Sequence, residues 1–145
     1  SGIALAQSIS SRADAPRARA YGAAFEVMKA RHAFWPMTKM DHVEAGIPKL
    51  DALVQTHPND IEIRYLRLVS TYFIPSFLGY SDHVREDFQR LAGALPLAQH
   101  EYSTEMMRMM SAFVVTHGDI DQRQRLRLES LAIDQAQQHG GMPGS

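Results

Sequence analysis

Residues 61–73, which read Ile-Glu-Ile-Arg-Tyr-Leu-Arg-Leu-Val-Ser-Thr-Tyr-Phe, decide the fold. Apolar and aromatic side chains fall on most sides of a helix drawn through this stretch, and that pattern is typical of a helix buried at the centre of a protein. Residues 58–60 (Pro-Asn-Asp) precede it and Pro75 follows it, and residues of these types start and limit helices. We expect this segment to be the central helix.

Helical periodicity continues along nearly the whole chain, and no four-residue window alternates convincingly with β-branched residues. The other predicted helices are residues 16–35, 41–57, 81–95, 97–117 and 119–139. Val43, Ile47, Leu50 and Val54 form the buried stripe of the second helix, in which Pro48 should cause a kink or delay the start. The prediction is an all-α fold of about six helices in antiparallel hairpins.

The composition excludes several classes of protein. The chain has 145 residues, of which 45% are hydrophobic and 21% charged, and its net charge is -1. This balance argues against nucleic acid as a partner, and no apolar run approaches the roughly 20 residues that insertion across a membrane needs. Cysteine is absent, which excludes disulfides, thiolate metal sites and a cysteine nucleophile.

The two ends are expected to lie outside one helical domain over residues 16–139. Residues 1–15 are interpreted as a tag scar, Ser1-Gly2, followed by the remnant of a signal peptide with the small-x-small pattern Ala4-Leu5-Ala6. Residues 8–16 are interpreted as an entry segment, and residues 140–145 as a flexible glycine-rich tail. The alternative for the beginning of the chain is a frayed polar leader with a few alanines.

Residues 42–59 resemble the second helix of a tetratricopeptide repeat (TPR). Gly46, Leu50, Leu53 and Pro58 fall where that repeat has a small residue, a large apolar residue, a small-to-medium residue and its closing proline. The small residue allows two helices to approach closely. The Trp-Leu-Gly-Tyr signature of the repeat's first helix is missing, so the resemblance is to a degenerate TPR-like array.

A second resemblance covers residues 21–88, about half of the chain. The segments 62–68 (EIRYLRL) and 75–80 (PSFLGY), with residues 21–24 (YGAA), are similar to an uncharacterised family of small exported bacterial proteins. This resemblance implies a TPR-like helical fold, a signal peptide and a periplasmic or otherwise exported location. It implies no catalytic residue.

Two arginines on the central helix are candidate binding residues. Arg64 and Arg67 share one strip with Thr71. In one interpretation they are structural, paired with nearby carboxylates or helix-end carbonyls, because buried charge needs a partner. In the other they grip a carboxylate or phosphate of a partner.

Aromatic residues form a second candidate group. Phe77 and Tyr80 flank Leu78-Gly79 in a turn that either folds onto the core or forms the lip of a pocket together with Trp35 and Tyr72. Gly79 would supply a backbone conformation that other residues avoid.

Methionine and histidine do not predict a cofactor. Met106, Met109 and Met110 fall on the predicted core stripe of residues 97–117, and only Met107 projects from it. Methionine can bind copper(I), but it also fills irregular gaps in cores. The seven histidines are spread singly, so we expect no metal site and no cofactor.

The sequence contains no catalytic or phosphate-binding motif. The prediction is a non-enzymatic module that binds a protein or peptide partner in a groove of a TPR-like array. The alternative is a carrier or sensor of a small hydrophobic ligand held between helices. An enzyme is the third possibility.

Overall fold

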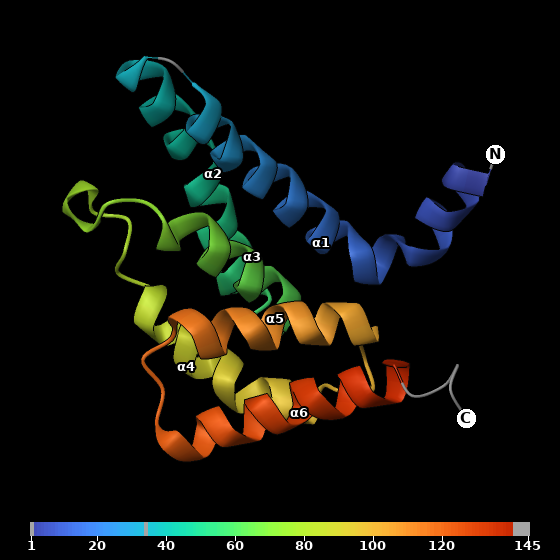
Figure 1. Ribbon diagram of the computed structural model, residues 1–145. Coiled ribbons are helices and arrows are strands. Elements are labelled where there is room, and N and C mark those ends of the chain that lie inside the picture. Colours follow the sequence, from blue (N-terminus) through green and yellow to red (C-terminus); the bar gives the residue numbers. More distant parts are fainter. Residues whose placement is uncertain (1, 34, 141–145) are drawn as a thin grey trace. The chain divides into compact units, whose positions relative to one another are not determined.

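The computed structural model describes residues 2–33 and 35–140, with side chains for 14–33 and 35–131. Within these ranges the protein consists of six α-helices and two short 3₁₀ helices, with no strand, which confirms the all-α prediction (Figure 1). The chain divides into two compact units, residues 1–81 and 82–145, whereas a single domain over 16–139 was expected. Each unit is described by itself.

The first unit contains three α-helices and one 3₁₀ helix: α1 (Gly2–His32), α2 (Pro36–Thr56), α3 (Ile61–Tyr72) and η1 (Ser76–Leu78). Helices α1 and α2 form an antiparallel hairpin, and α3 packs against both (Figure 1). Its core cluster comprises Ala20, Ala23, Val27, Val43, Ile47, Leu50, Leu53, Val54 and Ile63. The predicted stripe of the second helix is therefore confirmed as buried.

Gly46 sets the close approach of α1 and α2. A Cβ atom at this position would lie 2.6 Å from the carbonyl oxygen of Ala23 and would overlap the side chain of Val27. Only a residue without a side chain fits there, because neither the backbone of α1 nor the packed core can move away cheaply.

The first two helices begin earlier than predicted. Helix α1 begins at Gly2 instead of Pro16, so residues 8–16 are helical and not an entry segment. Its alanines favour the helix, which contains Pro16 and is bent in its N-terminal part (Figure 1). Helix α2 begins at Pro36, five residues before Asp41, because proline suits the first position of a helix as well as it ends one. Residues 141–145 of the predicted tail lie outside the described residues.

Helix α3 has the buried character that its sequence predicts. The Asp60 side chain caps it by accepting a hydrogen bond from the Ile63 amide at 3.0 Å, which satisfies one of the open donors of the first turn. Ile63 and Leu68 are completely buried, and Leu66 is half-buried. The contacts of α3 with both α1 and α2 place it at the centre of this unit.

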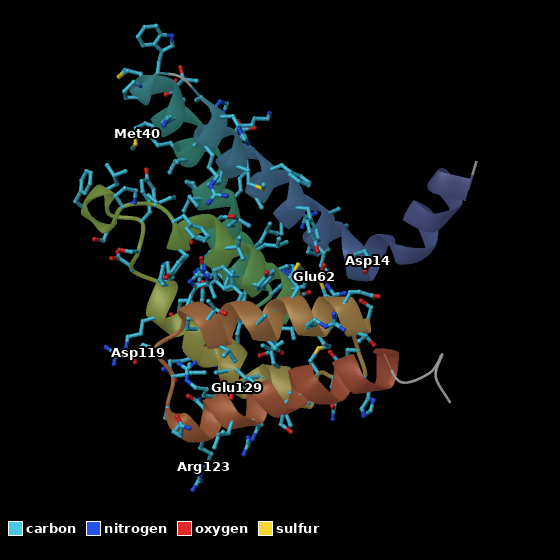
Figure 2. All side chains as sticks on the ribbon, viewed as in Figure 1. Asp14, Met40, Glu62, Asp119, Arg123 and Glu129 are labelled. Atoms are coloured by element: carbon cyan, nitrogen blue, oxygen red, sulfur yellow. The ribbon has the colours of Figure 1, made fainter. Side chains whose placement is uncertain are left out.

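An ion-pair cluster ties the start of α3 to α1. Arg17 Nε lies 2.9 Å from Asp60 Oδ2 and 3.6 Å from Glu62 Oε1, and the Tyr21 hydroxyl donates a hydrogen bond to Glu62. Asp14, which also pairs with Arg17, and Glu62 are labelled in Figure 2 on the α1 and α3 sides of the cluster. These contacts fix the register of α3 along α1.

A smaller polar cluster joins α1 to α2. His42 Nδ1 lies 2.9 Å from Glu26 Oε1, and Lys29 Nζ lies 3.1 Å from Glu26 Oε2. The hydrogen bond with His42, followed by the one from Lys29, holds the pKa of the Glu26 carboxyl below its ordinary value. Both contacts favour the ionised carboxylate.

This cluster gives a pH-dependent prediction. Because the pKa of Glu26 is lower in the folded state, its contribution to stability is present above the unfolded pKa of about 4.3 and is lost as the pH falls through the lower folded value. In a carboxyl NMR titration, we expect His42→Gln to raise the pKa of Glu26 towards its ordinary value, and His32→Gln, on the exposed end of α1, to leave it unchanged. An equal pKa in the wild type and His42→Gln would contradict the contact.

The second unit contains α4 (Val84–Ala94), η2 (Leu95–Leu97), α5 (Thr104–His117) and α6 (Gln122–Gly140). Helices α5 and α6 lie side by side as an antiparallel pair (Figure 1). At the end of α5, a Cβ on Gly118 would lie 2.6 Å from the Val114 carbonyl oxygen and 2.9 Å from the Phe88 ring. Glycine is thus required at this position by close packing and not by backbone conformation, because its extended backbone is one that any residue adopts.

The predicted core stripe of the methionine-rich helix is confirmed at Met110 but was wrong at Met107 and Met109. Met107 and Met110 are the fully buried methionines, together with Ser111 and Val114, whereas Met109 is 49% exposed. The helix begins at Thr104 and not near Leu97, and the buried positions 107, 110, 111 and 114 follow the i, i+3, i+4, i+7 pattern of one helical face. Packing accounts for Met107, which was expected to project from the core.

Candidate functional site

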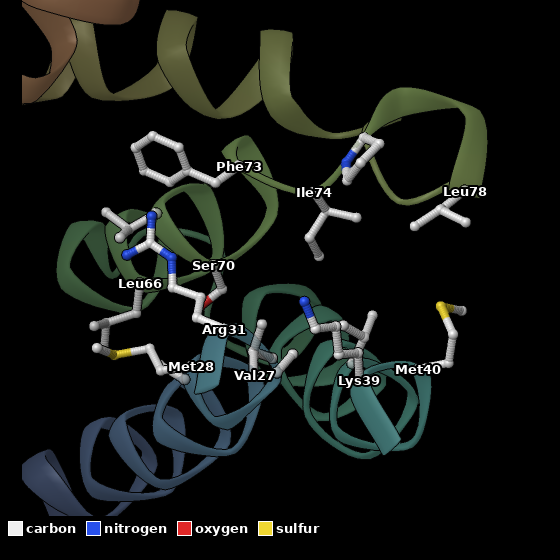
Figure 3. Close-up of a pocket in the computed structure, with 15 residues that line it drawn as sticks. Val27, Met28, Arg31, Lys39, Met40, Leu66, Ser70, Phe73, Ile74 and Leu78 are labelled. Atoms are coloured by element: carbon white, nitrogen blue, oxygen red, sulfur yellow. The ribbon is translucent and has the colours of Figure 1, made fainter. Parts of the chain in front are cut away.

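The first unit contains a pocket of about 290 Å³ between the α1–α2 hairpin and the segment from α3 to η1 (Figure 3). Three walls come from residues at helical spacing, and the chain after α3 closes a further side. The lining residues are Ala24, Val27, Met28, Ala30, Arg31, Lys39, Met40, Val43, Leu66, Val69, Ser70, Phe73, Ile74, Pro75 and Leu78. All of them belong to the same compact unit.

Helical periodicity explains why these side chains meet. On α1, residues 24, 27, 28 and 31 follow the i, i+3, i+4, i+7 pattern, and residues 66, 69, 70 and 73 at the end of α3 repeat it. Residues in this pattern share one face of a helix. Two largely apolar faces therefore line a common space, and Met40 and Val43 of α2 line it as well.

The lining is apolar except at three positions. Ser70 is its one uncharged polar side chain, Arg31 and Lys39 are its two charged ones, and it contains no carboxylate. Small-molecule sites have this composition, in which apolar walls supply burial and a few polar groups fix orientation.

The two cations come from opposite sides of the turn between α1 and α2. Arg31 is in the last turn of α1, and its guanidinium carbon lies 4.8 Å from the ring centroid of Phe73. Lys39 is near the start of α2, and its side chain extends into the space below Ile74 (Figure 3). Both side chains are exposed, so their charges stay hydrated at the edge of the apolar walls.

The arginines predicted to bind a partner are engaged within the fold. Arg64 and Arg67 are only 4% and 3% exposed. Arg64 Nη2 donates to the carbonyl oxygen of Pro58 at 3.1 Å, and Arg67 Nη1 lies 3.3 Å from Asp51 Oδ1. This geometry favours the structural interpretation of both residues, and their role in binding a partner stays a prediction.

The four aromatic candidates do not line the pocket either. Trp35 and Phe77 are 67% and 85% exposed, and Tyr80 packs on the core cluster of the first unit. The Tyr72 ring meets Phe73 edge-on, with 4.9 Å between centroids. Gly79 has φ +86°, which confirms the reason given for glycine in this turn.

Sequence reasoning did not single out the lining residues. Leu66, Val69 and Phe73 were predicted only as part of the apolar surface of the central helix, and no site was predicted on the face formed by residues 24, 27, 28 and 31. The sequence did contain one signal for the pocket. Arg31 stands at the end of an otherwise apolar face of α1, and Lys39 stands near the start of the next helix.

Neither a metal-binding cluster nor a membrane-spanning helix is found in the described part of the chain. No group of three or more histidine, aspartate or glutamate side chains there could hold a metal ion. None of the helices there has the length and apolar character needed to cross a membrane.

The fold and the pocket define an all-α protein with an apolar, cation-edged site in its first unit. No family model, no curated protein and no solved structure matches the chain. The resemblance to exported TPR-like proteins, and the export that it implies, therefore stay predictions.

Proposed function

We propose that this protein is a non-enzymatic binding protein whose first unit holds a small hydrophobic ligand between α1, α2 and α3. The observation that carries the proposal is the pocket, which has apolar side chains on three helices and no polar constellation suited to catalysis among its lining residues. This was the alternative prediction from the sequence, and the pocket favours it over a peptide groove centred on Arg64 and Arg67.

The volume of the pocket limits the size of the ligand. At about 30 Å³ for each water-sized group, a volume of 290 Å³ holds roughly ten non-hydrogen atoms. That is close to the lower end of the range for small-molecule sites. An eight-carbon chain with one polar end matches this size, so octan-1-ol is a suitable neutral probe.

Partly filling the pocket should weaken this binding. Ala30, which lines the pocket and is half-buried, adds three atoms when changed to methionine. At about 0.8 kcal/mol for each methylene group displaced, we expect Ala30→Met to weaken octan-1-ol binding more than tenfold. Isothermal titration calorimetry on the full chain measures the change.

Ala18→Met is the matched control, because Ala18 is an exposed position on the same helix and does not line the pocket. It should bind octan-1-ol as the wild type does. If the wild type and Ala30→Met bound the alcohol equally, or if neither bound it, the pocket would not be the binding site.

A protein or peptide partner is the second candidate function. It is supported by the exposure of two large aromatic side chains, Trp35 and Phe77, in the same unit, since such residues are frequent anchors of protein interfaces. Crosslinking through a photoreactive residue at position 77 in the native host would capture such a partner.

We also propose that the first unit is TPR-like. The support for this proposal is the close approach of α1 and α2 at Gly46 and the end of α2 two residues before Pro58. Helical arrays of this kind commonly present binding surfaces. Export of the protein rests on the family resemblance alone.

A further inference from the structure

We infer that the ligand of this pocket carries an anionic head group, such as a carboxylate, that lies against Arg31 and Lys39 while its hydrocarbon chain lies among the apolar walls. This inference rests on the proposed function and adds the charge and orientation of the ligand. It is carried by the placement of the two cations at one apolar site and by the absence of a carboxylate from the lining.

Several other basic residues of the first unit have acidic partners. Arg17 pairs with Asp60, Lys29 with Glu26, and Arg67 with Asp51. Arg31 and Lys39 form no ion pair with any described residue, although both lie within a few residues of acidic groups in the sequence. The pocket thus carries two positive charges that no described side chain neutralises.

Glu26, an acidic group on the same helix as Arg31, is already engaged. Both oxygens of Glu26 are used, one by Lys29 and the other by His42, and Glu26 does not line the pocket. A ligand anion would therefore meet no competing carboxylate from the lining, and its attraction to the cations would act beside apolar walls, where water screens it less than in bulk.

Arg31 is held in a position suited to this role. Its guanidinium lies over the Phe73 ring, 4.8 Å from the centroid. Stacking on an aromatic face leaves the N–H groups at the edge of the guanidinium plane available, and these can donate two parallel hydrogen bonds to a carboxylate. Lys39 adds a mobile point charge from α2 (Figure 3).

The test compares three probes that share one chain and differ in head-group charge: octanoate, octan-1-ol and octylammonium. We expect the full-length protein to bind octanoate about tenfold more tightly than octan-1-ol at low ionic strength, because charge-assisted hydrogen bonds form only with the carboxylate. Octylammonium should bind more weakly than the alcohol, and added salt should reduce the preference for octanoate.

The double variant Arg31→Gln/Lys39→Gln should bind octanoate no more tightly than octan-1-ol. Lys49→Gln, at an exposed position of α2 outside the pocket, should keep the full preference for octanoate. Circular dichroism of each variant checks that the helices are retained.

The outcomes separate this inference from the proposed function. Equal binding of octanoate and octan-1-ol by the wild type, or an unchanged octanoate preference in the double variant, overturns the head-group assignment and leaves the pocket as a hydrophobic site. Failure of all three probes to bind overturns the proposed function and this inference with it.

Discussion

Leu50→Ala should lower the free energy of unfolding by about 2–5 kcal/mol, the cost of removing a large side chain from a packed core. Leu50 is completely buried on α2 and belongs to the core cluster of the first unit. The loss combines the transfer energy of three carbon atoms with the cavity that the surrounding helices cannot fill. Urea denaturation followed by far-UV circular dichroism measures it.

Met37→Ala is the control for this substitution, since Met37 lies on the same helix and is 79% exposed. Its effect should stay within about 0.5 kcal/mol. Equal effects of the two substitutions would show that α2 does not bury the face assigned to it.

Gly46→Val should destabilise the protein by about 3 kcal/mol or more, because the new side chain has no space between α1 and α2. Its Cβ would lie 2.6 Å from the backbone oxygen of Ala23, and a backbone atom cannot rotate away as a flexible side chain can. The two helices would have to separate, and the contacts of the core cluster would weaken along the hairpin. Thermal and urea unfolding both report the change.

Gly22→Val makes the same chemical change on α1, where a Cβ would meet nothing within 4 Å. It should be nearly neutral, since valine is a slightly better helix former than glycine. If Gly46→Val were as stable as Gly22→Val, the result would contradict the close approach of α1 and α2 at Gly46.

Local patterns were sufficient to predict much of the first unit. The stripe of Val43, Ile47, Leu50 and Val54 predicted the buried face of α2, and residues 61–73 predicted a central helix. These predictions hold because a helix turns its apolar face inward, and apolar residues at helical spacing show which face that is. The structure confirms both.

Proline and methionine were harder to interpret. The predicted helix over residues 16–35 stops before Pro36, and the next was expected only from residue 41. Pro36 is in fact the first residue of that next helix, because a proline can both follow one helix and begin another. Met107 was assigned to the wrong face of its helix, because four methionines within residues 106–110 are compatible with more than one buried stripe.

The pocket could not be predicted from one sequence. Its walls come from three helices, and whether their apolar faces fill the space between them depends on side-chain volumes and on the positions of the backbones. Arg31 indicates a binding site only when it is seen at the same pocket as Lys39 and Phe73. Those contacts depend on how the end of α1, the start of α2 and the end of α3 are placed in the fold.

Methyl NMR with octan-1-ol tests the central claim most directly. In full-length protein with labelled methionine, leucine and valine methyl groups, titration should shift the signals of Met28, Met40, Leu66, Val69 and Leu78, which line the pocket. The signals of Met107 and Met110, buried in the second unit, should stay unchanged. An absence of shifts at the lining methyl groups, or shifts centred on the second unit, would contradict the account.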